Sequence, residues 1–141
     1  MNFEKQISLP CPDEFYLGEF HWDEYEECCK ALGYEQDEMG DATKLLGYSD
    51  VIQSPMEEEC ETVTRGYSRG CPEDFKKIPK NVKEDITKKA GEWMLLFQMG
   101  TISTAETEIM FGDCGHIYFW IKRSDLENRN FDDIWLILQC C

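Results

Sequence analysis

The stretch Ile109-Met-Phe-Gly-Asp-Cys-Gly-His-Ile-Tyr-Phe-Trp-Ile121 decides the fold that the sequence predicts. Two runs of β-branched and aromatic residues flank Gly112-Asp113-Cys114-Gly115, a four-residue connection whose two glycines adopt positive φ at little cost. This pattern is typical of a β-hairpin. We therefore expect residues 109–111 and 116–121 to pair as neighbouring strands.

Two further segments, residues 92–99 and 133–140, have the composition of strands. Each carries apolar side chains at both odd and even positions, which is typical of a strand covered on both faces. We expect an α+β fold with a mixed, largely antiparallel sheet and helices packed on it. A chain of 141 residues fits one core, so residues 1–141 are predicted to form a single α+β domain.

The spacing of apolar residues also predicts helices. In residues 22–32 they recur at intervals of three and four, and Gly33 supplies a left-handed cap. A second helix is expected within residues 79–91, with Asn81 as its N-cap. Ser124 and Glu127 match a capping box, which predicts a further helical turn at that point.

The remaining segments give weaker patterns. Residues 1–12 are expected to be extended, residues 34–41 to form a loop, residues 42–46 one helical turn and residues 62–64 a short edge strand. The acidic residues within 57–61 lack the alternating oxygen ligands and central glycine of an EF-hand. They are interpreted as a solvated face.

The charge of the chain limits its partners. The formal net charge of −15 opposes contact with phosphate backbones and with anionic membranes, so neither nucleic acid nor a membrane is expected as a partner. A basic protein is the partner that this charge favours. Residues 64–91 are the exception, with a net charge of +4, and their lysines are interpreted as a solvated helix face.

The eight cysteines are interpreted as cytosolic thiols. No secretory signal pattern precedes them, no Cys-x-x-Cys occurs, and two of the pairs are adjacent in sequence. No apolar run approaches the roughly 20 residues that span a bilayer. A cytoplasmic location is therefore expected.

One end of the predicted hairpin gathers a carboxylate, a thiol and an imidazole, from Asp113, Cys114 and His116. Such a set is compatible with a metal site or with a cysteine nucleophile beside its base. A zinc site needs further ligands from elsewhere, and a nucleophile needs an oxyanion hole. Turn residues that cap the hairpin are the favoured interpretation.

Strand alternation places His116, Tyr118 and Trp120 on one face of the predicted sheet. Together with nearby glutamines, these side chains are predicted to line a cleft that binds a partner segment. The candidate binding residues are Gln53, Gln98, Asp113, His116, Tyr118, Trp120 and Gln139.

Several motifs occur in a characteristic order. They are Leu45-Leu46-Gly47-Tyr48-x-Asp-x-Ile52-Gln53, Cys60, Trp93-x-Leu-Leu-x-Gln98, Gly112-Asp113-x-Gly115-x-Ile-Tyr118-Phe119-Trp120-Ile121, and Phe131-x-x-Ile-Trp135-Leu-Ile-Leu-Gln139-Cys140. This order resembles the YwqG-like family of uncharacterised bacterial proteins, and within it the C-terminal half. The chain departs from the family at residues 62–66, where it has Thr-Val-Thr-Arg-Gly in place of a Ser-Asn-Gly-like segment.

The resemblance implies an α+β domain without established enzymatic activity, and it is compatible with a toxin-neutralising role. It also implies a sheet surface left by the missing half, which self-association would cover. The hypothesis from the sequence is a non-enzymatic binding module without a cofactor. The alternative is a metal-dependent or thiol hydrolase at Asp113, Cys114 and His116.

Overall fold

The computed structural model describes residues 4–5, 7, 9–10, 21–33 and 43–140. Its centre is a four-stranded sheet in the order β1-β2-β5-β6, and each neighbouring pair is antiparallel. These strands are β1 (Lys44–Leu45), β2 (Trp93–Met99), β5 (His116–Lys122) and β6 (Trp135–Gln139). The predicted α+β class is confirmed, with antiparallel pairing throughout the described sheet.

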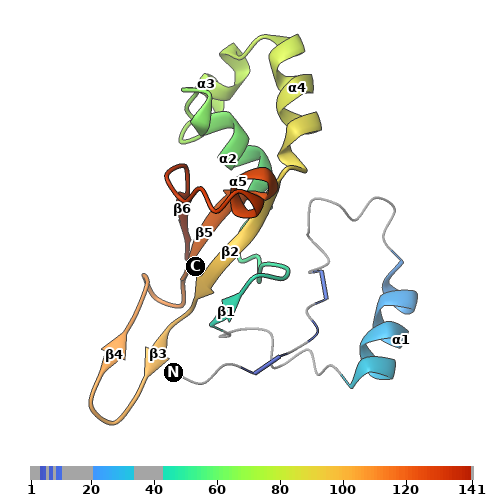
Figure 1. The fold of residues 1–141 in the computed structure, drawn as a ribbon, viewed down its shortest axis with the longest axis vertical. Helices are drawn as coiled ribbons and strands as arrows, with labels where there is room; N and C mark the ends of the chain where they lie inside the picture. The colour runs from blue at the N-terminus through green and yellow to red at the C-terminus, as the bar shows by residue number, and fades with distance from the viewer. Residues whose placement is uncertain (1–3, 6, 8, 11–20, 34–42, 141) are drawn as a thin grey trace.

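The other elements surround this sheet (Figure 1). Helices α2 (Glu57–Thr64), α3 (Pro72–Lys77) and α4 (Lys80–Ala90) gather at one end of the sheet, where α5 (Arg123–Glu127) follows β5. The small sheet of β3 (Ile102–Ser103) and β4 (Glu108–Ile109) extends from the opposite end, and α1 (Trp22–Leu32) lies to one side. No helix in the described ranges combines the length and apolarity that a bilayer crossing requires.

Local signals predicted the helix bounds with mixed success. The predicted helix at residues 22–32 is confirmed, and Gly33 closes it with a φ of 66°. The predicted cap of α4 is wrong by two residues, because Pro79 precedes its first turn. The helical turn predicted at Ser124 is confirmed by α5, but its capping box is wrong. The helix begins at Arg123, whose amide donates to the Glu92 carbonyl, and no described side chain caps it.

The predicted hairpin at residues 109–121 is wrong. Strand β4 pairs with β3, whereas β5 pairs with β2 on one side and β6 on the other. Both edges of β5 are therefore occupied, which leaves residues 109–111 no edge on which to pair. The turn chemistry was recognised correctly at Gly112, which has a φ of 67°.

Residues 57–64 form helix α2, so the predicted edge strand at residues 62–64 is wrong. The predicted solvated acidic face is wrong for Glu57 and Glu61, which are buried, whereas Glu58 and Glu59 are partly exposed. The hydroxyl groups of Thr62 and Thr64 donate to carbonyl groups one turn earlier, at 2.5 and 2.7 Å. Packing against the sheet decides the outcome, because Glu57, Cys60 and Glu61 are all buried.

Strand β6 is an edge strand and is not covered on both faces as predicted. Ile137 and Gln139 are buried, whereas Leu136 and Leu138 are 50% and 48% exposed. The predicted helical turn at residues 42–46 is also wrong over its described part, where β1 lies. The predicted loop at residues 34–41 and most of the predicted extended segment at 1–12 lie outside the described residues.

The core lies between the sheet and α2. Its buried cluster is Met56, Cys60, Trp93, Leu95, Tyr118, Trp120 and Ile137. Val51, from the segment between β1 and α2, packs against this cluster. One face of the sheet thus carries the buried side chains, and the segment that precedes α2 closes over it.

Candidate functional site

The structure does not leave His116, Tyr118 and Trp120 along an open groove as predicted. Their exposed fractions are 3%, 0% and 2%, because they lie on the face that the core covers. The Tyr118 hydroxyl donates to the Asp50 carbonyl at 2.6 Å, which ties this face to the segment between β1 and α2. The aromatic alternation was recognised correctly, but it belongs to the interior of the protein.

Four of the predicted binding residues do come together around the segment between β1 and α2, and they are Gln53, Gln98, Tyr118 and Gln139. Gln98 Nε2 donates to Asp50 Oδ2 at 2.6 Å, and the Asp50 amide donates to Gln98 Oε1 at 2.8 Å. Lys44 adds an ion pair to Asp50 at 2.6 Å. Side chains from β1, β2 and β5 therefore converge on Asp50.

Gln139 holds the next residues of the segment. Its Oε1 accepts from the amides of Ile52 and Gln53, both at 3.0 Å, and its Nε2 donates to the Ser54 carbonyl at 2.8 Å. Gln53 Nε2 donates to the Cys140 carbonyl at 2.6 Å. The predicted cleft is thus filled by residues 50–54 of the same chain.

The Asp113, Cys114 and His116 set does not form a reactive centre. Asp113 and Cys114 are exposed, whereas His116 is buried with its ring stacked on Tyr118 at 5.9 Å. Among the described residues, neither ring nitrogen of His116 has a hydrogen-bond partner, so this imidazole does not act as a base for the Cys114 thiol. Within the described ranges, no group of three or more His, Cys, Asp and Glu residues is arranged to hold a metal.

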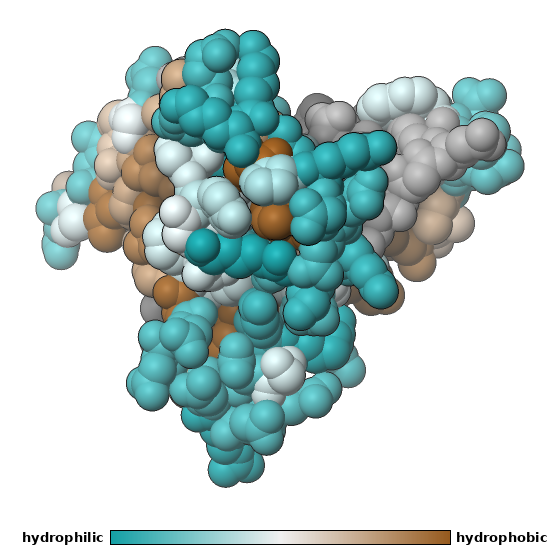
Figure 2. Space-filling model, turned by 90° about the horizontal axis from the view of Figure 1, so that it is seen from above, coloured by the Kyte–Doolittle hydropathy of each residue, from teal (hydrophilic) through white to brown (hydrophobic). Residues whose placement is uncertain are grey.

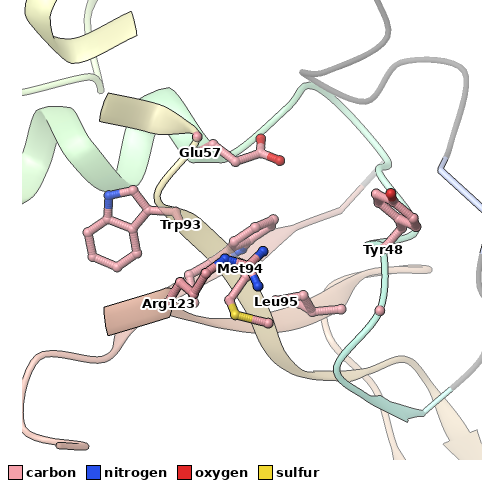
Figure 3. A pocket seen from close by; sticks show the side chains of 9 residues that line it. Tyr48, Glu57, Trp93, Met94, Leu95 and Arg123 are labelled. Carbon is pink, nitrogen blue, oxygen red and sulfur yellow. The ribbon is translucent and has the colours of Figure 1, made fainter. Parts of the chain in front are cut away.

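A pocket of about 410 Å³ lies beside β2 (Figure 3). Trp93, Met94 and Leu95 form its wall along the strand. The other side chains of the lining come from three elements and from the loop after β1, and they are Glu57 of α2, Trp120 of β5, Arg123 of α5 and Tyr48 of the loop. Figure 3 shows the Glu57 carboxylate pointing toward the side on which Tyr48 lies, whereas the Trp93 indole points away.

Two buried polar atoms of this lining, Glu57 Oε2 and Trp120 Nε1, have no hydrogen-bond partner among the residues that the structure describes. Glu57 is 1% exposed and Trp120 is 2% exposed. Leaving a buried polar atom unpaired costs about 1–3 kcal/mol, and more for a charged group. Such atoms are uncommon in folded proteins, and Ser49, Thr101 and His116 hold the others in the described part of the chain. A ligand seated in this pocket would supply partners to the two atoms that line it.

The edge of β2 that faces the pocket has no strand partner in the described part of the chain. Strand β1 pairs with β2 only at Phe97 and Gln98. Because the Arg123 amide bonds to the Glu92 carbonyl, the alternation of antiparallel pairing turns the main-chain groups of Trp93 and Leu95 away from β5. The pocket therefore also offers main-chain donors and acceptors.

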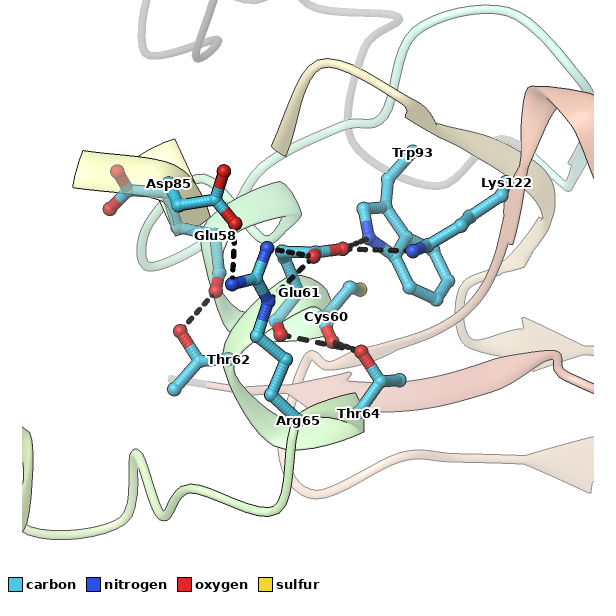
Figure 4. A network of polar contacts seen from close by, with 9 residues as sticks. All are labelled: Glu58, Cys60, Glu61, Thr62, Thr64, Arg65, Asp85, Trp93 and Lys122. Atoms are coloured by element: carbon cyan, nitrogen blue, oxygen red, sulfur yellow. Dashed lines mark hydrogen bonds and ion pairs between the residues drawn. The ribbon is translucent and has the colours of Figure 1, made fainter. Parts of the chain in front are cut away.

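A second buried carboxylate, Glu61, lies one turn further along α2 and is fully satisfied (Figure 4). Its Oε2 accepts from Trp93 Nε1 at 2.9 Å and from Lys122 Nζ at 3.1 Å. Its Oε1 accepts from Arg65, which also bridges to Asp85 on α4 at 2.8 Å. Burial opposes ionisation of Glu61, but these hydrogen bonds from Trp93, Arg65 and Lys122 hold its pKa below the ordinary value.

The neighbouring thiol of Cys60 is chemically quiet. It is fully buried in the core, and burial together with Glu59 and Glu57 raises the pKa of the Cys60 thiol above its ordinary value. A thiol held in its protonated form is a poor nucleophile. The α2 helix is therefore a packing element with two contrasting carboxylates.

The family model for the domain of unknown function DUF1963 matches residues 3–140, nearly the whole chain. The chain belongs to the DUF1963 family. No curated protein and no solved structure is significantly similar to it. The geometry of this DUF1963 domain is therefore the basis for any assignment of function.

The outer face of the sheet in this DUF1963 domain is apolar. Register places Leu45, Phe97, Phe119 and Leu136 in one row across all four strands. Met99, Ile117 and Leu138 form a second row, across three strands. Figure 2 shows apolar residues gathered on the side of the molecule where β4 and β6 lie in Figure 1.

Sequence reasoning missed Glu57 and Arg123 as site residues. Glu57 and Glu61 are four residues apart, with the apolar Cys60 between them, so a helical reading would have placed both carboxylates on the core side. No local signal distinguishes Arg123, because its position at the pocket follows from the end of β5. The pocket forms only when three segments far apart in sequence meet.

Proposed function

We propose that this DUF1963 domain is a non-enzymatic binding module for a basic protein partner. The observation that carries the proposal is the apolar outer face of the sheet, defined by the two rows that cross β1, β2, β5 and β6. Leu45, Leu136 and Leu138 on this face are 55%, 50% and 48% exposed. Contiguous exposed apolar surface of this kind is typical of protein interaction sites.

Charge indicates which partner fits this face. Residues 92–140 carry eight acidic and three basic side chains, a net charge of −5. Asp132 and Asp133 are exposed shortly before β6 begins at Trp135, and Asp113 is exposed beyond β4. A segment with an apolar stripe and flanking lysines or arginines would bury its stripe on the rows and place its charges beside these carboxylates.

The resemblance to the YwqG-like proteins supports a bacterial, cytoplasmic setting for this module, and its toxin-neutralising implication agrees with capture of a basic protein. The arrangement of Asp113, Cys114 and His116 gives no support to a hydrolase. The alternative is that a second copy of the chain covers the outer face, and sedimentation of the wild type and of the Leu136→Lys, Leu138→Lys double variant distinguishes the two.

The test uses two defined peptides with the same apolar stripe, one flanked by lysines and the other by glutamates, and measures binding by fluorescence anisotropy. We expect only the lysine peptide to bind, with an affinity that falls as salt rises. Leu136→Lys with Leu138→Lys should abolish binding, whereas Leu32→Lys, an exposed leucine on α1, should not.

Two results would contradict the proposal. The first is equal binding of both peptides by the wild type and by the double variant. The second is a stable dimer in sedimentation that the Leu136 and Leu138 changes dissociate, because the face would then be occupied by a second copy of the chain.

A further inference from the structure

The pocket beside β2 is separate from the outer face and carries its own chemistry. Its lining combines one carboxylate, from Glu57, with one guanidinium, from Arg123. No ion pair joins Glu57 to any described residue, and its Oε2 has no partner. Neither Glu57 nor Arg123 forms an ion pair with another described residue, so a pocket lined by both is complementary to a ligand that carries one charge of each sign.

From this arrangement we infer that the pocket binds a free α-amino acid. The ammonium group donates to the Glu57 carboxylate, and the carboxylate group faces Arg123. Hydrogen bonds between ionised groups are stronger than those between neutral groups, and a zwitterion forms one such bond at each of its ends, with Glu57 and with Arg123. Neutral ligands would leave Glu57 buried without a counter-charge, which is unfavourable.

The uncharged groups of the pocket fit the same ligand. Trp120 Nε1 is a buried donor without a partner, and the unpaired edge of β2 adds main-chain donors and acceptors at Trp93 and Leu95. A carboxylate has more lone pairs than one guanidinium fills, so these N–H groups complete its coordination.

The wall of the pocket indicates which amino acids fit. Met94, Leu95 and the Trp120 ring present apolar surface, and Tyr48 closes the side toward which Glu57 points. A volume of about 410 Å³ lies at the lower end of the range for small-molecule sites, which is roughly 300–1,000 Å³. We therefore assign the pocket to amino acids with apolar or aromatic side chains.

The exposed side chains of the lining show from which side a ligand enters the pocket. Tyr48 and Arg123 are exposed members of the lining, whereas Glu57 and Trp120 are buried behind them. Rotation of Tyr48 and Arg123 opens the path to Glu57. Binding should therefore change the environment of Trp120 and its fluorescence.

The test is isothermal titration of the full chain with leucine, methionine and phenylalanine, alongside tryptophan fluorescence. We expect saturable binding of at least one of them. For a ligand that binds, the matched amine without a carboxylate and the N-acetylated form without an ammonium should each bind roughly tenfold or more weakly, the loss of one charge-assisted hydrogen bond.

Variants locate the site. Glu57→Gln and Arg123→Gln should each weaken binding by a similar factor. Glu59→Gln, on the same helix but outside the lining, and Lys88→Gln, an exposed charge on α4, should leave it unchanged. Circular dichroism confirms that each variant is folded.

Absence of saturation at millimolar concentrations of all three amino acids would overturn the assignment, and so would wild-type affinity in folded Glu57→Gln. Neither result bears on the outer face. Leu136→Lys with Leu138→Lys should bind the amino acid normally, so the two proposals fail independently.

Discussion

Gln98 and Asp50 hold each other through two hydrogen bonds, although 48 residues separate them in sequence. The Gln98 side chain donates to the Asp50 carboxylate at 2.6 Å and accepts from the Asp50 amide at 2.8 Å. Gln98 is fully buried. The pair therefore fixes the segment before α2 on the sheet, and it explains why predicted binding residues serve the interior of the protein.

The first prediction concerns Gln139, the other glutamine that holds the segment before α2 on the sheet. Gln139→Leu removes the partners of three main-chain groups, at Ile52, Gln53 and Ser54. Because these groups are partly buried, we expect a loss of about 3 kcal/mol in the free energy of unfolding, measured by urea denaturation. Gln53→Leu is the control: this side chain is exposed, so its loss should cost less than about 1 kcal/mol.

The second prediction concerns acid stability. The pKa of Glu61 is lower in the folded protein than its ordinary value of 4.5, so its contribution to stability is complete above that pH and is lost as the pH falls toward the folded-state pKa. Glu61→Gln should lower stability by about 3 kcal/mol at pH 7 and flatten the acid limb below pH 4.5. Thermal unfolding across pH measures both effects.

Glu84→Gln is the matched control for Glu61, since its contact with Lys80 is 3.7 Å long and its side chain is 67% exposed. We expect almost no change in stability or in the acid limb. An acid limb in Glu61→Gln as steep as that of the wild type would contradict the role assigned to this network.

The third prediction concerns Glu57, one turn before Glu61 on α2. Here the same change, from glutamate to glutamine, is not expected to lower the free energy of unfolding. Glu57 is buried with an unpaired carboxylate oxygen, so Glu57→Gln removes a charge that nothing in the described structure compensates. We expect the free energy of unfolding at pH 7 to stay the same or to rise by about 1 kcal/mol. A fall as large as that of Glu61→Gln would show that Glu57 is paired in solution.

The fourth prediction concerns Gly115, before β5. A β-carbon there would collide with the Phe111 carbonyl oxygen and lie 2.6 Å from the Gln139 carbonyl oxygen. Both contacts are main chain and cannot rotate aside, so Gly115→Ala should destabilise the protein by about 3 kcal/mol. Among the described residues, a β-carbon at Gly70 meets only the Ser68 hydroxyl, at 3.9 Å, so Gly70→Ala should be tolerated in the same denaturation assay.

The sequence alone determined the elements whose signal is local. Helix α1 was predicted with its bounds, because apolar spacing and the left-handed Gly33 act within one segment. The strands β2, β5 and β6 followed from their apolar and β-branched composition. Their order in the sheet required pairing information that no single segment contains, so residues 109–111 were assigned to the wrong partner.

The tertiary structure decided which side chains are buried and which are available. Glu57 and Glu61 look alike in the sequence. Packing against β2 nevertheless leaves Glu57 Oε2 without a hydrogen-bond partner among the described residues, whereas it surrounds Glu61 with donors. The same packing buries Tyr118 and exposes Leu136, although both belong to apolar strands. Composition gives a residue its tendency to be buried, but only long-range contacts determine its partners and its exposure.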